Sequence, residues 1–129
     1  MKLICIDYGG KRVGLASTDE AGEFALPRAV LPNDGELFKT VMDFIQENNI
    51  ERVVIGESKN LDGSRNPILD DAEKFGKLLE EKGVEVVFHP EMYSSMEADR
   101  LQGQNSMRDA SAAAIILKSY IDTQNNSFS

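Results

Sequence analysis

Residues that often build specialised sites are scarce in this sequence, which has no tryptophan, one cysteine and one histidine among 129 residues. Cys5 cannot form an internal disulfide, and its place within an apolar run is typical of a small buried side chain. His89 follows an apolar run, and we interpret it as an ordinary strand residue rather than a ligand or a general base. The two residues provide no set of sulfur and nitrogen ligands for a metal ion.

Long hydrophobic runs are also absent, and no stretch approaches the length that a membrane-spanning helix needs. The first ten residues carry one lysine and a short apolar stretch that ends at Asp7, which is not typical of a signal or transit peptide. We therefore expect a soluble, cytoplasmic protein without a membrane partner.

Positive charge is in short supply, since 14 basic residues face 22 acidic ones and the net charge is −8. Such a chain has no long-range attraction for nucleic acid, whose binding draws on many contacts between cations and phosphates. A polyanionic partner would have to be held locally.

The length fits one domain, which we place at residues 1–123, followed by a polar tail, 124–129, that we expect to fray. Apolar runs predict five strands, and apolar residues at helical spacing predict the helices between and after them. The strands are expected within 3–8, 11–20, 22–31, 51–58 and 84–91, and the helices at 36–48, 67–83, from 94 onward and at 109–122.

Three strands in a meander are followed by alternating helices and strands, an order typical of an α/β sheet with antiparallel and parallel parts. The run at 51–58 is apolar between polar flanks, as in a central parallel strand that is covered on both faces. Pro27 is easiest to accommodate in an edge strand, and Asn33 or Asp34 is expected to cap the helix that follows.

Four carboxylates stand at the ends of these elements: Asp7, Glu57, Glu91 and Asp109. Ligand sites in parallel α/β sheets gather at the carboxyl ends of strands, so these side chains can meet at one edge. Neighbouring carboxylates repel each other, and Mg²⁺, which prefers oxygen ligands, would neutralise them. Two such ions about 4 Å apart can clamp the attacking water and the leaving oxygen of a phosphodiester.

A simpler interpretation of these acids stays open. Among 22 acidic residues some fall at the ends of strands and helices by chance, and Asp109 can be a helix cap alone. The spacing of the acids does not decide between a metal site and this alternative.

Four segments carry a family likeness: IDYGGKRVGLASTD at 6–19, VVIGESKNLDGS at 53–64, HPEMYSSMEADRL at 89–101 and RDASAAAIILKSYID at 108–122. Together they resemble the YqgF family, the proposed Holliday junction resolvases and ribosomal RNA nucleases with a ribonuclease H-like fold. The likeness covers nearly the whole chain, and the joint match is far more specific than any one segment.

The resemblance implies a five-stranded mixed sheet, with the first three strands antiparallel, flanked by helices. It also implies a nuclease that depends on Mg²⁺ or Mn²⁺ and whose acidic triad, carried over by position, is Asp7, Glu91 and Asp109. The implied reaction is processing of the 5′ end of the precursor of small-subunit ribosomal RNA, or, by an older proposal, the cutting of branched DNA.

Two departures from the family pattern concern the middle acid of this triad. Glu91 stands between a proline and a methionine where the family usually has Asp-Glu-Arg, so a second acid and a cation are missing. Glu57 stands between a glycine and a serine where the family usually has Gly-Leu-Pro. Glu57 can therefore join Glu91 as a ligand or replace it.

A further group of residues is expected to hold phosphates around the acids. The alternative is that cations fall near acids by chance and that the NLDGS segment, 60–64, is a simple turn. RNA or branched DNA is the expected partner, recognised by shape or brought by a delivery protein or ribosomal precursor. The expected substrate-binding residues are Lys11, Arg12, Lys59, Asn60, Ser64, Arg65 and Arg108.

Two other functions stay open from the sequence. The D-x-G-G-K segment at 7–11 also resembles the first phosphate loop of actin-like ATPases and sugar kinases, but those proteins bind ATP between two domains. The altered residues around Glu91 also permit a non-catalytic RNA-binding or ribosome-assembly factor on the same fold. The sequence does not decide between a monomer and a homodimer, although a junction resolvase usually needs two active sites.

Overall fold

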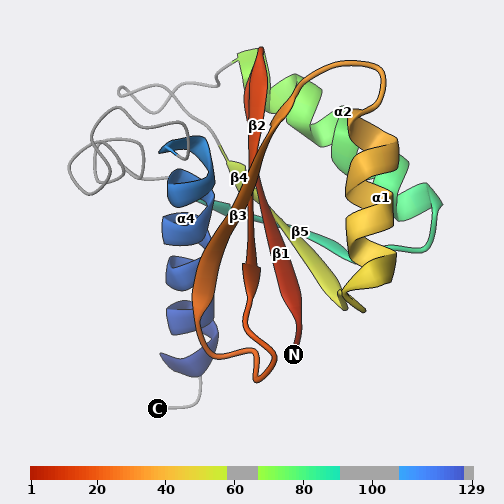
Figure 1. Ribbon diagram of the computed structural model, residues 1–129. Coiled ribbons are helices and arrows are strands. Elements are labelled where there is room, and N and C mark those ends of the chain that lie inside the picture. Colours follow the sequence, from red (N-terminus) through yellow and green to blue (C-terminus); the bar gives the residue numbers. More distant parts are fainter. Residues whose placement is uncertain (58–66, 91–107, 127–129) are drawn as a thin grey trace.

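The computed structural model describes residues 1–57, 67–90 and 108–126, and within them the strands and helices follow the order predicted from the sequence (Figure 1). The strands are β1 (Leu3–Tyr8), β2 (Arg12–Thr18), β3 (Ala25–Pro32), β4 (Arg52–Glu57) and β5 (Val86–Pro90). The helices are α1 (Leu37–Glu47), α2 (Pro67–Glu81) and α4 (Arg108–Asn126).

The strands form a single mixed sheet with the order β3-β2-β1-β4-β5. β1, β2 and β3 pair antiparallel, whereas β4 pairs parallel with both β1 and β5. The predicted five-stranded mixed sheet is therefore confirmed. Pro27 lies in the edge strand β3, as expected, and faces Ala16 next to a shift in the pairing register.

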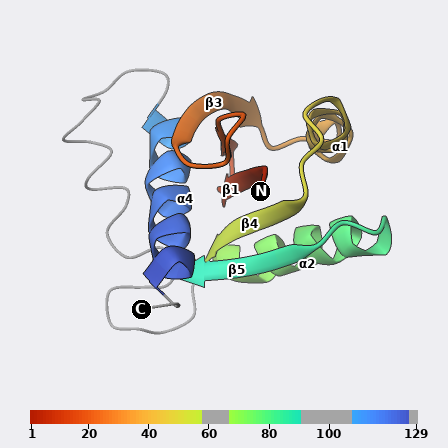
Figure 2. The same ribbon diagram turned by 90° about the horizontal axis from the view of Figure 1, so that it is seen from below.

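Helices cover both faces of the sheet: α1 and α2 lie on one face and α4 lies on the other (Figures 1 and 2). Because successive side chains of a strand point to opposite faces, β1 contributes to both layers. Ile4 and Ile6 pack toward α1 and α2, whereas Leu3 and Cys5 pack toward α4. Cys5 is fully buried and fills space in the core, as the sequence predicted.

Two apolar clusters stabilise these layers, one on each face of the sheet. Burying a large apolar side chain contributes about 1.5–3 kcal/mol, so the clusters hold the sheet rigid between its helices. The first cluster contains Ile4, Ile6, Val13, Leu15, Leu37, Val41, Ile45, Val53, Ile55, Ala72, Phe75 and Leu79. The second contains Leu3, Cys5, Ala16, Val54, Ala113, Ile116, Leu117, Tyr120 and Ile121.

The predicted helix caps before α1 were wrong. The residue before the first turn of α1 is Glu36, and its side chain makes no capping hydrogen bond. Asp34 accepts a hydrogen bond from the Glu36 backbone amide at 2.9 Å, within the turn that precedes the helix. Asn33 bonds to a different part of the chain, which contributes to the candidate site.

The other helix boundaries differ little from those predicted. α2 begins at Pro67 and ends before Gly83, whose φ of +85° lies in the left-handed region that glycine adopts most easily. α4 continues to Asn126, past residue 123. The helix predicted from Ser94 lies outside the described residues. None of the helices in the described part of the chain is long and apolar enough to cross a membrane.

Candidate active site

Asp7 lies near the end of β1, on the face of the sheet that α4 covers. Leu3, Cys5 and Asp7 alternate with the residues that face α1 and α2, so the carboxylate continues the row that packs under α4. Asp7 is half-buried, and its direct neighbour in the antiparallel pair is Gly14 of β2. A strand fixed in a packed sheet holds this carboxylate more firmly than a loop would.

Gly14 allows the first turn of α4 to lie directly against β2. A methyl group added at Gly14 would overlap the backbone carbonyl of Asp109 and would lie 2.9 Å from the backbone nitrogen of Ala110. Ala110 and Ala113, both fully buried, keep the adjoining face of α4 small. Because Gly14 pairs with Asp7 and contacts Asp109, it brings the two acids to one edge of the sheet.

The role of Gly14 was not identified from the sequence, although a signal was present. A glycine inside a strand has no side chain to pack and often marks a place where another backbone approaches closely. The neighbours of Gly14 in β2 are apolar and buried, which makes its lack of a side chain stand out. What the sequence does not show is that the approaching backbone belongs to a helix 95 positions further along.

Asp109 is held in part by an ion pair with Arg12, which lies at the start of β2. The Arg12 Nε donates to Asp109 Oδ2 at 3.1 Å. The Arg12 side chain is 68% exposed and the Asp109 side chain 31% exposed, so this pair lies at the surface. Asp109 also lies in the first turn of α4, where the helix dipole favours a negative charge.

The turn between β1 and β2 is fixed by Asn33, which follows β3. Asn33 Nδ2 donates to the Gly9 carbonyl at 2.7 Å, and the Asn33 backbone amide donates to the Lys11 carbonyl at 2.9 Å. A side chain at Gly9 would overlap the Arg12 carbonyl, so the turn requires glycine at this position. The loop that follows Asp7 is thereby held at both ends.

The far half of α4 is anchored to β4 and β5 through Tyr120. Arg52 Nη1 donates to the Tyr120 hydroxyl at 2.8 Å, and Arg52 Nη2 lies 2.9 Å from Glu85 Oε1. The hydrogen bond to Glu85, and then that to Tyr120, raises the pKa of Arg52. His89 packs edge-on against the Tyr120 ring at 5.6 Å and forms a 2.9 Å hydrogen bond with Ser119. His89 therefore lies in a strand, as the sequence predicted, and connects β5 to α4.

Glu57 does not share the face on which Asp7 and Asp109 lie. It is the last residue of β4, in the row that contains Val53 and Ile55, and those two side chains pack with α1 and α2. The structure therefore places Glu57 on the opposite face of the sheet from Asp7.

The other residues expected at the site fall into two groups. Lys11 is exposed in the turn after β1, close in sequence to Asp7 and Arg12, and Arg108 is the first residue of α4. The side chain of Arg108 lies outside the described part of the structure. Also outside it are Lys59, Asn60, Ser64, Arg65 and Glu91.

The chemistry of Asp7 and Asp109 fits a hard divalent cation. Both provide oxygen ligands, and Mg²⁺ is often bound through one or two carboxylates, with waters and substrate phosphates as the remaining ligands. Within residues 1–57, 67–90 and 108–126 there is no group of three or more His, Cys, Asp or Glu side chains that could hold a metal ion. A third protein ligand would have to come from the rest of the chain.

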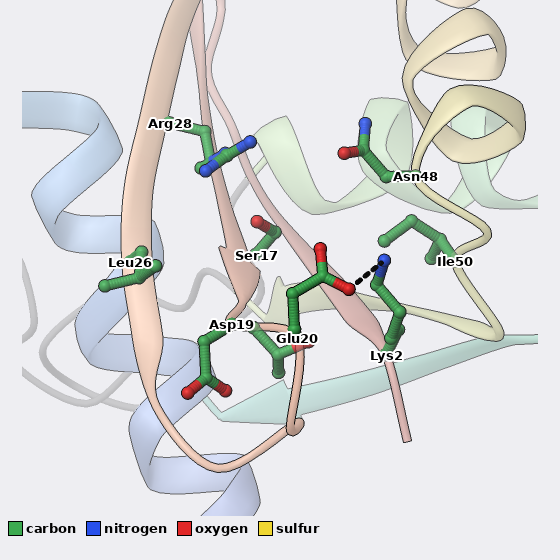
Figure 3. Close-up of a pocket in the computed structure, with 9 residues that line it drawn as sticks. Lys2, Ser17, Asp19, Glu20, Leu26, Arg28, Asn48 and Ile50 are labelled. Carbon is green, nitrogen blue, oxygen red and sulfur yellow. Dashed lines mark ion pairs between the residues drawn. The ribbon is translucent and has the colours of Figure 1, made fainter.

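A hollow of about 220 Å³ lies near the other end of the sheet (Figure 3). Its charged groups already have partners: Lys2 Nζ lies 3.5 Å from Glu20, and Arg28 lies over the Phe44 ring at 5.7 Å. Backbone amides of the turn after β2 donate to Asp19 and lower the pKa of that carboxyl. These contacts already engage the charged groups of the hollow, so we place the candidate site at Asp7 and Asp109.

Known proteins resemble this chain over nearly its whole length. Residues 1–123 match the family described as RuvX, Holliday junction resolvase. Curated relatives named "Putative pre-16S rRNA nuclease" include one from Caldanaerobacter subterraneus subsp. tengcongensis, 32% identical over 98% of this chain and 100% of its own length. Another, from Bordetella parapertussis, is 33% identical over 94% of this chain and 93% of its own length.

Solved structures share the fold at low sequence identity. RuvC of T. thermophilus in complex with a Holliday junction substrate has a TM-score of 0.64 and 17% identity, covering 98% of both chains. The Fowlpox virus resolvase bound to Holliday junction DNA has a TM-score of 0.62 and 12% identity, covering 96% of this chain and 99% of its own. These similarities confirm the predicted ribonuclease H-like fold class. The chain therefore belongs to the RuvX family, and the resemblance to the YqgF family drawn from its motifs is confirmed.

Proposed function

We propose that this protein is a nuclease that hydrolyses nucleic-acid phosphodiesters, with Asp7 and Asp109 as catalytic carboxylates. The observation that carries the proposal is the arrangement around Gly14, which pairs with Asp7 in the sheet and contacts Asp109 in α4. Membership of the RuvX family and the nuclease name of the curated relatives support the same activity.

The nuclease is proposed to use Mg²⁺ or Mn²⁺, bound by Asp7 and Asp109. Glu91, which the family resemblance assigns to the triad, is proposed as the third ligand. Glu57, the alternative that the sequence left open, lies on the opposite face of the sheet from Asp7 and is not proposed. The bound metal would polarise a phosphate oxygen and lower the pKa of a water that attacks phosphorus. Support for a hard cation comes from the ligand chemistry of the two carboxylates.

The chain's own residues have distinct tasks in this proposal. Asp7 is fixed by β1, and Asp109 is fixed by the contact between α4 and β2, so the spacing of the two acids is set before substrate arrives. Lys11 and Arg12 are exposed beside them and are proposed to bind phosphates next to the scissile one. Lys59, Asn60, Ser64, Arg65 and Arg108 are proposed to extend this surface.

The proposed substrate is the 5′ end of the precursor of small-subunit ribosomal RNA, because the curated relatives carry the name pre-16S rRNA nuclease. Branched DNA is the second candidate, supported by the family description. The net charge of −8 disfavours binding through many phosphate contacts, so we expect recognition of shape or delivery by a ribosomal precursor or partner protein. The protein is proposed to act in the cytoplasm, as a monomer or a homodimer.

A cleavage assay with the purified full chain tests this proposal and selects the substrate. The substrates are a precursor ribosomal RNA fragment, a synthetic four-way junction and a linear duplex, each with Mg²⁺, with Mn²⁺ and with a chelator. We expect cutting of the RNA fragment only when metal is present. Binding of RNA without cleavage would favour the non-catalytic assembly factor, and ATP binding by calorimetry would favour the actin-like alternative.

A further inference from the structure

Arg12 is bonded to one carboxylate oxygen of Asp109, which is a proposed metal ligand. Its Nε lies 3.1 Å from Asp109 Oδ2, and the strand row that contains Arg12, Gly14 and Ala16 is the one that faces α4. Arg12 and Asp109 are separated by 97 positions in the chain, so the pair exists only because β2 and α4 meet. The cation and the acids lie on the same face of the sheet.

The pair with Asp109 uses one of the three nitrogens of the Arg12 guanidinium. Only Nε bonds to Asp109, and within the described part of the chain neither terminal nitrogen of Arg12 makes a hydrogen bond. A guanidinium matches carboxylate and phosphate equally well, because both present two oxygens to its planar fork. The 68% exposed side chain can therefore reach an incoming polyanion.

Exchange of Arg12 between partners requires that its bond to Asp109 be weak. An exposed ion pair typically changes the equilibrium constant between its paired and separated states by only about 1.5-fold to fivefold. A divalent cation carries twice the charge of Arg12 and approaches a carboxylate oxygen more closely, at about 2.0–2.1 Å for Mg²⁺. A metal ion can thus displace the guanidinium, and the like charges then repel each other.

We propose that Arg12 is a positioning residue that exchanges partners: it holds Asp109 before metal binds and moves to a substrate phosphate when metal takes that carboxylate. This inference rests on the proposed function, because it assumes that the metal binds at Asp109. In this scheme, binding of the metal at Asp109 releases Arg12, which can then bind a substrate phosphate. Arg12 therefore competes with the metal in the free protein and assists substrate binding in the loaded one.

The test is calorimetric titration of Mn²⁺ into the full-length protein without nucleic acid, comparing wild type with Arg12→Gln and Lys11→Gln. Both variants lose one positive charge, but within the described residues it is Arg12, and not Lys11, that forms an ion pair with Asp109. We expect Arg12→Gln to bind Mn²⁺ about two- to fivefold more tightly than wild type, and Lys11→Gln to change the affinity less than about twofold.

A second readout follows the other half of the exchange. RNA affinity is measured with Mn²⁺ at several salt concentrations, and we expect it to be lower in Arg12→Gln. We also expect the affinity of this variant to depend less steeply on salt, by the amount that the loss of about one phosphate contact gives. Arg12→Lys keeps the charge but lacks the fork, so we expect Mn²⁺ affinity between those of wild type and Arg12→Gln. Melting temperatures measured alongside verify that each variant is folded.

The outcomes separate this inference from the function on which it rests. Equal Mn²⁺ affinity in wild type, Arg12→Gln and Lys11→Gln, or weaker binding in Arg12→Gln, overturns the exchange and leaves the nuclease proposal standing. If neither wild type nor any variant binds Mn²⁺, the metal site and the exchange both fail. Tighter binding of Mn²⁺ in Arg12→Gln, without a comparable change in Lys11→Gln, supports the exchange.

Discussion

Asp7 and Gly14 lie directly opposite each other in the antiparallel pair of β1 and β2, and Gly14 sets how closely α4 can approach Asp7. The acid is fixed by the sheet, and the glycine fixes where the second acid, Asp109, comes to lie. The lack of a side chain at Gly14 thus determines where Asp109 lies relative to Asp7.

Substitution of Gly14 by alanine is therefore expected to impair both stability and cleavage. The added methyl group would overlap backbone atoms of Asp109, which cannot move aside as a flexible side chain can. We expect a loss of about 1–3 kcal/mol in the free energy of unfolding, as in overpacked cores, measured by urea denaturation. Displacement of Asp109 by about 1 Å is expected to slow cleavage about 100-fold.

The control for this substitution is Gly35→Ala, because a methyl group at Gly35 would have no atom within 4 Å. It should stay within about 0.5 kcal/mol of wild type and should cleave at the wild-type rate. Wild-type stability and activity in Gly14→Ala would show that the contact between β2 and α4 does not position the site.

The anchoring of α4 by Tyr120 gives a second prediction. Tyr120→Phe removes the hydroxyl that accepts a hydrogen bond from Arg52 at 2.8 Å and leaves that donor half-buried. We expect the free energy of unfolding to fall by about 1–2 kcal/mol in urea titrations. Tyr8→Phe is the matched control, since Tyr8 packs against Phe75 and its hydroxyl makes no bond within the described residues. Equal stability of the two variants would contradict the anchoring role of Tyr120.

His89 gives a prediction about pH. Burial lowers the pKa of His89 below the ordinary value of 6.5, an effect that the nearby Glu57 charge partly opposes. The unfolded chain therefore takes up a proton at His89 before the folded protein does, and acidification below about pH 6.5 favours unfolding. Stability should rise with pH through this region and level off above it.

The measurement is the free energy of unfolding between pH 5 and 8 for wild type and His89→Gln. We expect a shallower loss of stability in the variant on the acid side of pH 6.5, because its side chain does not titrate. Parallel pH profiles for the two proteins would show that His89 contributes nothing to the pH dependence.

Local patterns were sufficient to predict the sheet and the place of Asp7. The alternation of Leu3 to Tyr8 predicted a strand buried on both faces, and the alanine-rich stretch after Asp109 predicted a helix with a small apolar face. Both signals repeat with the period of the element itself, so a window of a few residues contains them.

Contacts between distant segments were not predictable in the same way. Asn33 looked like a helix cap because its neighbours favour that role, yet it bonds to Gly9, 24 positions earlier. Arg12 was expected to bind phosphate, and its ion pair with Asp109 depends on how β2 and α4 meet. The face occupied by Glu57 follows from alternation along β4 only once it is known which helices cover each side.

The central claim is that Asp7 and Asp109 act together in hydrolysis, and it is tested most directly by metal-dependent cleavage in Asp7→Asn and Asp109→Asn. Asp122→Asn is the control, because Asp122 lies on the exposed side of the same helix, 3.1 Å from Lys118. We expect both site variants to fold normally and lose cleavage of the preferred substrate, while Asp122→Asn cleaves as wild type does. A folded Asp7→Asn or Asp109→Asn protein that still cuts at the wild-type rate would contradict the account.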